Sequence, residues 1–227
     1  MAQKRQRSTR EARPMCGRAA IAGVIGLGAV TAAEAHPHVW IEARSTLVVE
    51  AESLVGVRHS WTFDRLFSLQ ATADLVADAE GRFDAQALQP LADLYAETLP
   101  PWGFFTEVRA TDAAAPQLRA RPMRLEHDGQ RLTLHLDLDL EPPLPLAAFD
   151  QVRVHDRTFY VSISYPAVDG ARLQSETDCT LYLHRPGQLD PALVEALAAV
   201  PASVRELPPE LAGRVRDAAH RIELACP

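Results

Sequence analysis

The stretch VWIEARSTLVVEAESLVGVRHSWTF, residues 39–63, contains the pattern that decides the fold. Its two halves, residues 39–49 and 54–63, are rich in valine, isoleucine, tryptophan and threonine and partly alternate between apolar and polar residues. This composition and alternation are typical of β-strands. The polar stretch Glu50-Ala51-Glu52-Ser53 separates the halves, so residues 39–63 are predicted to form a β-hairpin.

The period of the apolar residues changes after the hairpin. Between residues 64 and 99 they recur at helical spacing on both sides of Gly81. Asp64 stands where a carboxylate caps a following helix. The segment is therefore predicted to be a pair of helices inserted among strands, with the repeating residues Leu66, Leu69, Ala73, Val76, Leu88, Leu91, Leu94 and Tyr95.

Short strand-like runs resume near residue 104 and are separated by turn residues. In the segments 191–200 and 208–220 the apolar residues recur at helical spacing, and a proline lies near the start of each. The predicted fold class is α+β: an antiparallel β-sheet or sandwich with the inserted helical pair and C-terminal helices. The turns are expected at Pro142-Pro143, Asp169-Gly170 and Pro186-Gly187. The strands are expected at residues 104–110, 117–126, 131–140, 151–154, 158–165 and 179–183, and core aromatic residues at Trp61, Phe63, Trp102, Phe104 and Phe105.

The first 35 residues have the order of a secretory signal peptide. Basic residues precede a short apolar run, residues 19–30, and Ala33-Glu34-Ala35 supplies the small residues of a cleavage site. The apolar run is well short of the roughly 20 residues that span a bilayer. We expect cleavage after Ala35, a periplasmic location and no stable membrane insertion of the single domain 36–227. An uncleaved N-terminal anchor is the alternative.

The charge balance bears on the partners of the protein. The whole chain has a formal net charge of −7, and the leader contains six lysine or arginine residues against two glutamates, so the mature chain is more acidic still. Such a chain repels nucleic acid and anionic lipid and attracts cations. We therefore expect no nucleic-acid partner, and the charge is compatible with cation capture.

Two of the three cysteines, Cys179 and Cys226, lie in the expected mature chain. An oxidising compartment allows such a pair to form a disulfide. This bond is expected to tie the C-terminus to the body of the domain. A thiolate metal pair is the alternative, but the sequence has no short C-x-x-C spacing.

Cleavage after Ala35 would leave the sequence His36-Pro37-His38 at the start of the mature chain. The free α-amine and the imidazole of His36 can then chelate one ion, and His38 can add a third nitrogen. Nitrogen ligands of this kind suit zinc, nickel, cobalt or copper. Pro37 has no N–H and so excludes the square-planar motif that uses a deprotonated amide at the second position. A frayed, solvated chain end is the alternative interpretation.

Folding would have to bring in further ligands. His59 and the pair His155-Asp156 are the candidates, since each lies in or beside a predicted strand near large aromatic residues. His59 is equally compatible with a core histidine hydrogen-bonded to backbone. Asp156 either orients an imidazole or caps the turn before Thr158.

Motifs for other chemistry are absent or incomplete. The spacing of Asp78, Glu80 and Asp84 resembles an EF-hand loop, but Val76 and Ala87 occupy the first and twelfth positions, so a connection without calcium is expected. No P-loop, G-x-G-x-x-G, G-x-S-x-G or H-E-x-x-H pattern is present. The sequence favours a protein that is not an enzyme.

The segments His36–Ile41, His59–Asp64, Gly103–Thr106 and His155–Val161 give the chain a resemblance to a known family. It resembles the domain-of-unknown-function family numbered one thousand and seven. That resemblance implies an exported bacterial protein described as a periplasmic component of an uncharacterised ABC-type transport system, often associated with nickel/cobalt-type permeases or zinc-related loci. Where relatives tend to have tyrosine this chain has His155, so a ligand role for His155 does not follow from the resemblance.

Together these features predict a periplasmic transition-metal-binding accessory or solute-binding component of a metal uptake or homeostasis system. Its expected partner is an inner-membrane metal permease or ABC transporter. The expected ligands are His36 and His38, with zinc, nickel or cobalt ahead of copper. A histidine-brace copper enzyme and a non-catalytic envelope interaction module are the alternatives.

Overall fold

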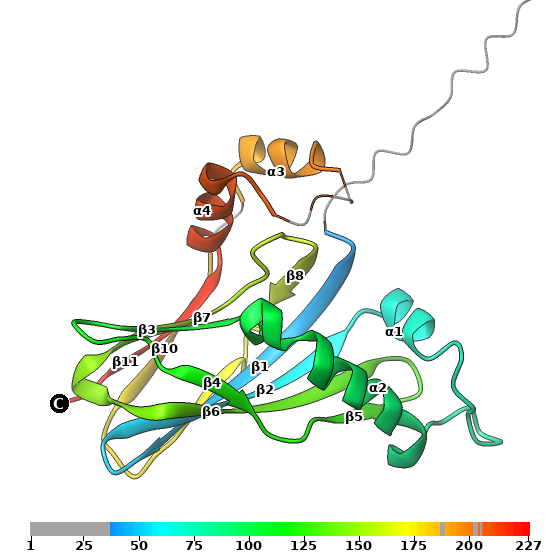
Figure 1. Ribbon diagram of the computed structural model, residues 1–227, viewed down its shortest axis with the longest axis horizontal. Helices are drawn as coiled ribbons and strands as arrows, with labels where there is room; N and C mark the ends of the chain where they lie inside the picture. The colour runs from blue at the N-terminus through cyan, green and yellow to red at the C-terminus, as the bar shows by residue number, and fades with distance from the viewer. Residues whose placement is uncertain (1–36, 187–188, 202–203, 205) are drawn as a thin grey trace, which may run out of the picture. The chain divides into compact units, whose positions relative to one another are not determined.

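The long hairpin of residues 39–63 and strand β6 (Leu132–Pro145) form the centre of the larger of two sheets (Figure 1). The computed structural model describes residues 37–186, 189–201, 204 and 206–227, all of which belong to one compact unit. These residues form a seven-stranded and a four-stranded sheet together with short helices, which confirms the α+β class. The predicted leader, residues 1–35, lies outside the described residues.

Strands β1 (Val39–Glu50) and β2 (Ser53–Phe63) pair in antiparallel fashion, as predicted, and β6 (Leu132–Pro145) pairs with the other side of β2. Over most of their length, every second residue of these strands is buried, because alternate side chains point to opposite faces of a sheet. The buried series Leu132, Leu134, Leu136 and Leu138 is at most 1 % exposed. One face of the large sheet therefore forms the core, and the other is polar.

Four short strands complete the large sheet. β4 (Gln117–Ala120) and β5 (Arg124–His127) pair with β6 in antiparallel fashion. β8 (Val161–Ser164) and β9 (Ala171–Gln174) pair with β1 in parallel fashion. The parallel pairs were not predicted, because a parallel partner is decided by where the chain returns and not by the pattern within the strand.

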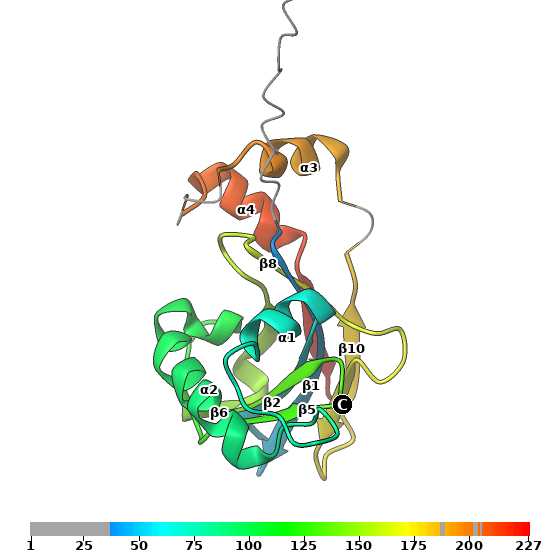
Figure 2. The same cartoon turned by 90° about the vertical axis from the view of Figure 1, so that its right-hand side faces the viewer.

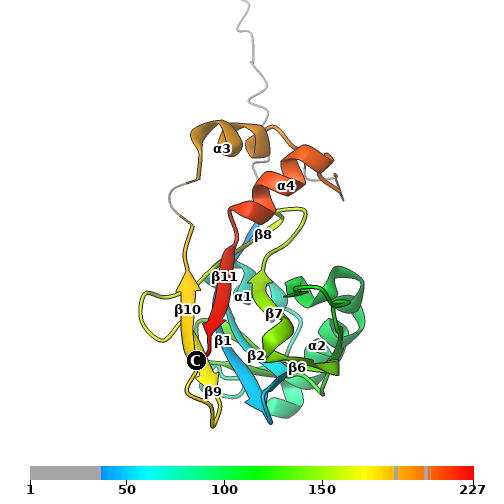
Figure 3. The same ribbon diagram turned by 90° about the vertical axis from the view of Figure 1, so that its left-hand side faces the viewer.

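The four-stranded sheet has the order β10-β11-β7-β3, and Figure 3 shows β10, β11 and β7 side by side. It consists of β3 (Thr106–Ala110), β7 (Phe149–Val154), β10 (Thr180–His184) and β11 (His220–Ala225). Val108, Val152, Val154 and Ile222 belong to the same buried cluster as the leucines of β6. The inner face of this sheet thus contributes to one core shared with the large sheet.

The helical pair predicted between residues 64 and 99 is confirmed as α1 (Arg65–Ala71) and α2 (Ala85–Thr98) (Figure 2). The first helix is shorter than predicted, because it ends before Ala73 and Val76. The predicted repeat is also not the buried face throughout, since Leu66, Leu69 and Leu94 are exposed. Asp64 caps α1 by accepting a hydrogen bond from the Phe67 N–H at 2.9 Å, as expected. Phe63 at the end of β2 stacks on Phe67 of α1 and on Tyr95 of α2, with ring centroids 4.7 and 5.9 Å apart. These contacts attach both helices to the same core.

The C-terminal helices α3 (Pro191–Ala198) and α4 (Pro209–Asp217) form a second, smaller apolar cluster that contains Leu193, Leu197, Leu207 and Val215. Both helices were predicted, but the helix expected to reach His220 ends at Asp217, and His220 begins β11. No described helix is long and apolar enough to cross a membrane.

Other boundaries also differ from the sequence predictions. β6 continues through Pro142-Pro143, which were expected to end it. The pairing of β6 with β2 shifts register at this point, so the prolines fall where no regular ladder hydrogen bond is needed. Residues 100–105 form a 3₁₀ segment, so the strand predicted from residue 104 begins only at Thr106. A second 3₁₀ turn covers residues 146–148. Residues 155–160 form a loop, so the strand predicted from residue 158 begins only at Val161.

The predicted disulfide between Cys179 and Cys226 is confirmed. The bond joins the residue before β10 to the residue after β11, which are neighbouring strands. It therefore closes a segment of 47 residues that contains both C-terminal helices. The C-terminus is tied to the small sheet, as the cysteine positions predicted.

Candidate functional site

The first described residues lie beside strand β8. Val39 is in parallel register with Val161, and the His38 backbone N–H donates to the Tyr160 carbonyl at 2.9 Å. The His38 and Tyr160 rings also contact each other, with centroids 4.9 Å apart. His38 is therefore held against the loop of residues 155–160, while His36 lies outside the described residues.

Asp156 organises this loop from inside. Its side chain is buried and accepts hydrogen bonds from the Thr158 N–H at 2.8 Å, the Thr158 hydroxyl at 2.9 Å and the Val161 N–H at 2.9 Å. Of the two predicted roles for Asp156, the turn cap is confirmed. Because its oxygens accept these hydrogen bonds, Asp156 fixes the backbone that holds Tyr160 and, through Tyr160, His38.

His155 precedes Asp156 and lies against strand β3. Its Nε2 is 3.3 Å from a carboxylate oxygen of Glu107, which can only accept, so Nε2 carries the proton and Nδ1 is unprotonated. Burial lowers the pKa of His155, and the hydrogen bond to Glu107 opposes this effect only in part. Nδ1 is buried and has no hydrogen-bond partner among the residues that the structure describes. A neutral imidazole with an unprotonated nitrogen is the form that binds a metal ion.

An aromatic cavity of about 180 Å³ adjoins the loop. Two exposed rings contribute to it, Trp102 and Tyr160, of which 38 and 41 % is accessible. Trp102 was expected in the core, and this expectation is wrong, because the 3₁₀ segment 100–105 turns the ring towards the loop instead of the sheet. The other residues that line the cavity are Phe105, Asp156, Thr158, Val161 and Val204.

The backbone around the site is strained at three aromatic residues. Phe104, Phe105 and Phe159 have φ angles of 54°, 49° and 57°, in the left-handed region. Each such residue costs about 1–3 kcal/mol. The two strained segments meet, since the His155 N–H donates to the Phe105 carbonyl at 2.8 Å. Strain of this kind clusters at binding sites, which supports the loop as a candidate functional site.

His59 lies elsewhere, in the core between the two sheets, and is 3 % exposed. The Thr106 hydroxyl donates to the Phe104 carbonyl at 2.8 Å and so accepts from His59 Nε2–H at 3.1 Å. Burial lowers the pKa of His59 to about 3, so the ring is neutral and Nδ1 accepts from the Ser45 hydroxyl at 2.8 Å. The Tyr165 hydroxyl completes the chain by donating to Ser45 at 2.7 Å. Both nitrogens of His59 are therefore hydrogen-bonded to side chains. The alternative prediction of a core histidine hydrogen-bonded to backbone is wrong about the partners.

The EF-hand-like loop forms the predicted connection between α1 and α2. Asp78 accepts hydrogen bonds from the N–H groups of Glu80 and Arg82 and forms an ion pair with the Arg82 guanidinium at 3.1 Å. These contacts lower the pKa of Asp78, the Arg82 backbone hydrogen bond being the largest cause. The carboxylate thus stabilises a turn.

The predicted ligands fall into two separate parts of the structure. His38, His155 and Asp156 belong to one strand start and the adjoining loop, whereas His59 belongs to the core chain. Among the residues that the structure describes, no three His, Cys, Asp or Glu side chains are arranged to hold a metal ion. Tyr160 and Glu107 were given no site role from the sequence, and Trp102 was assigned to the core. The aromatic run before residue 106 was the available signal for Trp102.

Comparison with known proteins identifies a family. A family model described as protein of unknown function (DUF1007) matches residues 21–226, which is nearly the whole chain. No curated protein matches the chain in sequence.

Proposed function

The chain belongs to the DUF1007 family, and we propose that it is a periplasmic transition-metal-binding accessory or solute-binding component of a metal uptake or homeostasis system. The observation that carries this proposal is the fixed position of His38 against Tyr160, directly after Pro37. A histidine that is already ordered loses little conformational entropy when it binds an ion. The α-amine and imidazole of His36 would complete the site after cleavage.

His155 is the described side chain best suited to add a ligand. It lies five residues before Tyr160 in the loop that contacts His38, and its imidazole is neutral. Within the described part of the chain, its Nδ1 has no hydrogen-bond partner. Asp156 and His59 suit the role less well, because their polar atoms already form hydrogen bonds that coordination would have to break. A nitrogen-rich set of this kind favours zinc, nickel, cobalt or copper over calcium or magnesium.

The proposed partner is an inner-membrane metal permease or ABC transporter, to which the protein would deliver its ion. The strained loop at Phe159 supports a role in exchange, because a local rearrangement there would move Tyr160 and with it His38. The acidic net charge supports the same role, since it raises the local concentration of cations.

The experiment uses the exported protein. Mass spectrometry first locates its N-terminal residue, which we expect to be His36. Native mass spectrometry with competing zinc, nickel, cobalt and copper then gives the stoichiometry, expected as one ion per chain. His36→Ala and His38→Ala should each weaken binding by about tenfold or more, since each removes a nitrogen ligand. His127→Ala, at the end of β5, is the matched control and should bind as the unaltered protein does.

A trimmed protein that binds none of the four metals would overturn the proposal. So would binding that is unchanged in both His36→Ala and His38→Ala. A mature chain that retains the leader would remove the α-amine ligand and contradict the proposed site.

A further inference from the structure

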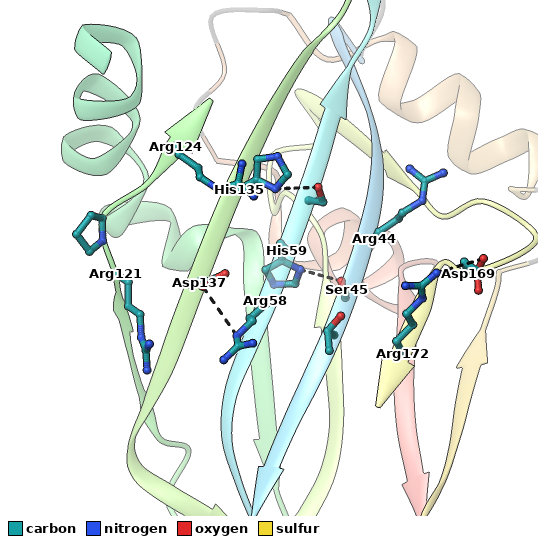
Figure 4. A pocket seen from close by; sticks show the side chains of 13 residues that line it. Arg44, Ser45, Arg58, His59, Arg121, Arg124, His135, Asp137, Asp169 and Arg172 are labelled. Carbon is teal, nitrogen blue, oxygen red and sulfur yellow. Dashed lines mark hydrogen bonds and ion pairs between the residues drawn. The ribbon is translucent and has the colours of Figure 1, made fainter. Parts of the chain in front are cut away.

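The polar face of the large sheet carries a groove of about 550 Å³ that is separate from the loop at His38. The groove crosses strands β6, β2 and β1, and five arginines line it (Figure 4). Arg44 and Arg172 lie on one side, Arg121 and Arg124 lie on the other, and Arg58 lies between them.

Strand register explains how the arginines come together. In one row, Arg44 faces Ser60, Ser60 faces His135, and His135 faces Arg124. Residues opposite each other on neighbouring strands lie on the same face. Both ends of this row are therefore arginines, separated by three strand spacings, or about 14 Å between backbones.

The next row repeats the arrangement over a greater width. Arg172 faces Thr46, Thr46 faces Arg58, and Arg58 faces Asp137. The Arg121 N–H donates to the Asp137 carbonyl at 2.9 Å and so ends the row on the far side. Four strand spacings separate Arg172 from Arg121, or about 19 Å between backbones. The two rows thus place cationic groups at both rims of the groove and one, Arg58, in its floor.

Arginine is concentrated along the groove, although the chain as a whole is acidic. The lining holds five arginines against Asp137 and Asp169, although the whole protein has a formal net charge of −7. Each of the five arginines also forms an ion pair, because Glu42, Asp139 and Glu126, which lie outside the lining, pair with Arg44, Arg121 and Arg124. An anion can therefore bind here only by replacing these carboxylates.

The arginines are held by ion pairs that a ligand can replace. Arg44 pairs with Glu42 at 3.0 Å and Arg172 with Asp169 at 3.3 Å. Between 42 and 65 % of each of the five arginine side chains is exposed. Exposed pairs contribute only about 0–1 kcal/mol, so exchange of a protein carboxylate for a ligand anion costs little. Arginine binds phosphate and carboxylate bidentately, which favours that exchange.

We infer that this groove is a binding site for an elongated polyanion whose anionic groups reach both rims, such as a chain of phosphates. One phosphate is held by one or two guanidiniums, so the two rims need separate anionic groups. A free oligophosphate and the phosphates of lipid headgroups share this chemistry. The volume of the groove lies in the range of small-molecule sites.

The test is calorimetric titration of the metal-free mature protein with orthophosphate, pyrophosphate and tripolyphosphate at fixed ionic strength. Affinity should rise with the length of the phosphate chain. The double variants Arg44→Gln/Arg172→Gln and Arg121→Gln/Arg124→Gln each remove one rim and should each weaken tripolyphosphate binding by about tenfold or more. The corresponding lysine double variants keep the charge and should lose less affinity, because lysine does not bind bidentately.

The control is Arg109→Gln/Arg214→Gln, which removes two exposed, ion-paired arginines outside the groove. It should bind tripolyphosphate within about twofold of the unaltered protein. Equal losses in the control and in the groove variants would overturn the proposal, since they would indicate a response to net charge alone. Affinity independent of phosphate chain length would also overturn it.

Co-sedimentation with vesicles that contain phosphatidylglycerol separates the two sources of the anion. Tripolyphosphate binding without vesicle binding supports a free polyanion. Vesicle binding that both groove variants abolish supports lipid headgroups. Absence of binding to tripolyphosphate and to vesicles would overturn the proposal, and it would leave the metal site at His36 and His38 untouched, because the two sites share no residue.

Discussion

Ser45 and His59 face each other across strands β1 and β2, and the Ser45 hydroxyl donates to Nδ1 of the His59 ring at 2.8 Å inside the core. Both belong to the buried series of their strands, so the alternation that buries leucines elsewhere buries two polar residues here. Tyr165 and Thr106 satisfy the remaining polar atoms. The result is a directed chain of hydrogen bonds that links the two sheets.

The first prediction concerns the pH dependence of stability. Burial holds the pKa of His59 at about 3 in the folded protein, against 6.5 when the ring is exposed. Above pH 6.5 both states are neutral at this residue, and its contribution is complete. As the pH falls from 6.5 towards 3, only the unfolded state gains a proton, so the free energy of unfolding should fall by up to about 1.4 kcal/mol per pH unit.

His59→Gln should make that slope shallower in urea denaturation measured at a series of pH values, since glutamine does not titrate. The slope and not the absolute stability is compared, because the substitution also disturbs the hydrogen-bond chain. His220 has its pKa lowered to about 4, mainly by burial, and adds a slope of the same sign. An unchanged slope in His59→Gln would contradict the assignment of a neutral, buried ring.

Removal of the Tyr165 hydroxyl tests the chain directly. Tyr165→Phe should lower the free energy of unfolding by about 1–2 kcal/mol, because Ser45 loses the donor to its buried oxygen. Tyr182→Phe is the matched control; that ring is 49 % exposed, and its variant should change stability by less than about 0.5 kcal/mol. Equal effects in chemical denaturation of the two variants would count against a stabilising role for the chain.

Substitution of Asp156 separates a structural role from coordination. Asp156→Asn places an amide donor where the carboxylate accepts from backbone N–H groups, and we expect a loss of about 2 kcal/mol in stability. Asp128→Asn is the control, since Asp128 caps an exposed turn through the Gln130 and Arg131 N–H groups. Native mass spectrometry should still find one metal ion on the folded Asp156→Asn protein. Loss of the ion without loss of stability would show instead that Asp156 is a ligand.

The disulfide gives a fourth prediction. A cross-link that closes 47 residues stabilises a domain by about 4 kcal/mol in the chain-entropy account, and measured effects are commonly about 2–4 kcal/mol. The variant Cys179→Ser/Cys226→Ser should therefore unfold at a lower urea concentration than the oxidised protein. Reductant should shift the unaltered protein in the same direction and leave the double variant unchanged. A reductant effect on the double variant would point to another cause.

Much of the fold followed from local patterns. The hairpin of residues 39–63 was predictable because the alternation of apolar and polar residues over two long segments indicates both the strands and their buried face. The helical pair and its Asp64 cap were predictable from local sequence as well, since a cap and the helix that it begins lie within one turn of each other. β11 was missed because a six-residue strand next to a helix has too few residues to show a period.

The candidate site was less predictable. The His36-Pro37-His38 pattern and the residues His155-Asp156 were visible in the sequence, but the turn-capping role of Asp156 depended on where Thr158 and Val161 return to it. Tyr160 was not identified because its contact with His38 joins residues that are 122 positions apart. The arginine rows were equally hidden, since their members come from β1, β2, β5 and β9 and from the residues after β4.

The sequence by itself determined the strands and helices with a clear period, the pairing of Cys179 with Cys226 and the availability of histidines near the expected chain start. These features depend on the order of neighbouring residues and on the chemistry of each side chain. Only the tertiary structure decided which face each polar residue occupies, that His59 is enclosed by hydroxyls, and that five arginines gather on one sheet face. Strand register and the return of distant segments decide such contacts, and no local pattern encodes them.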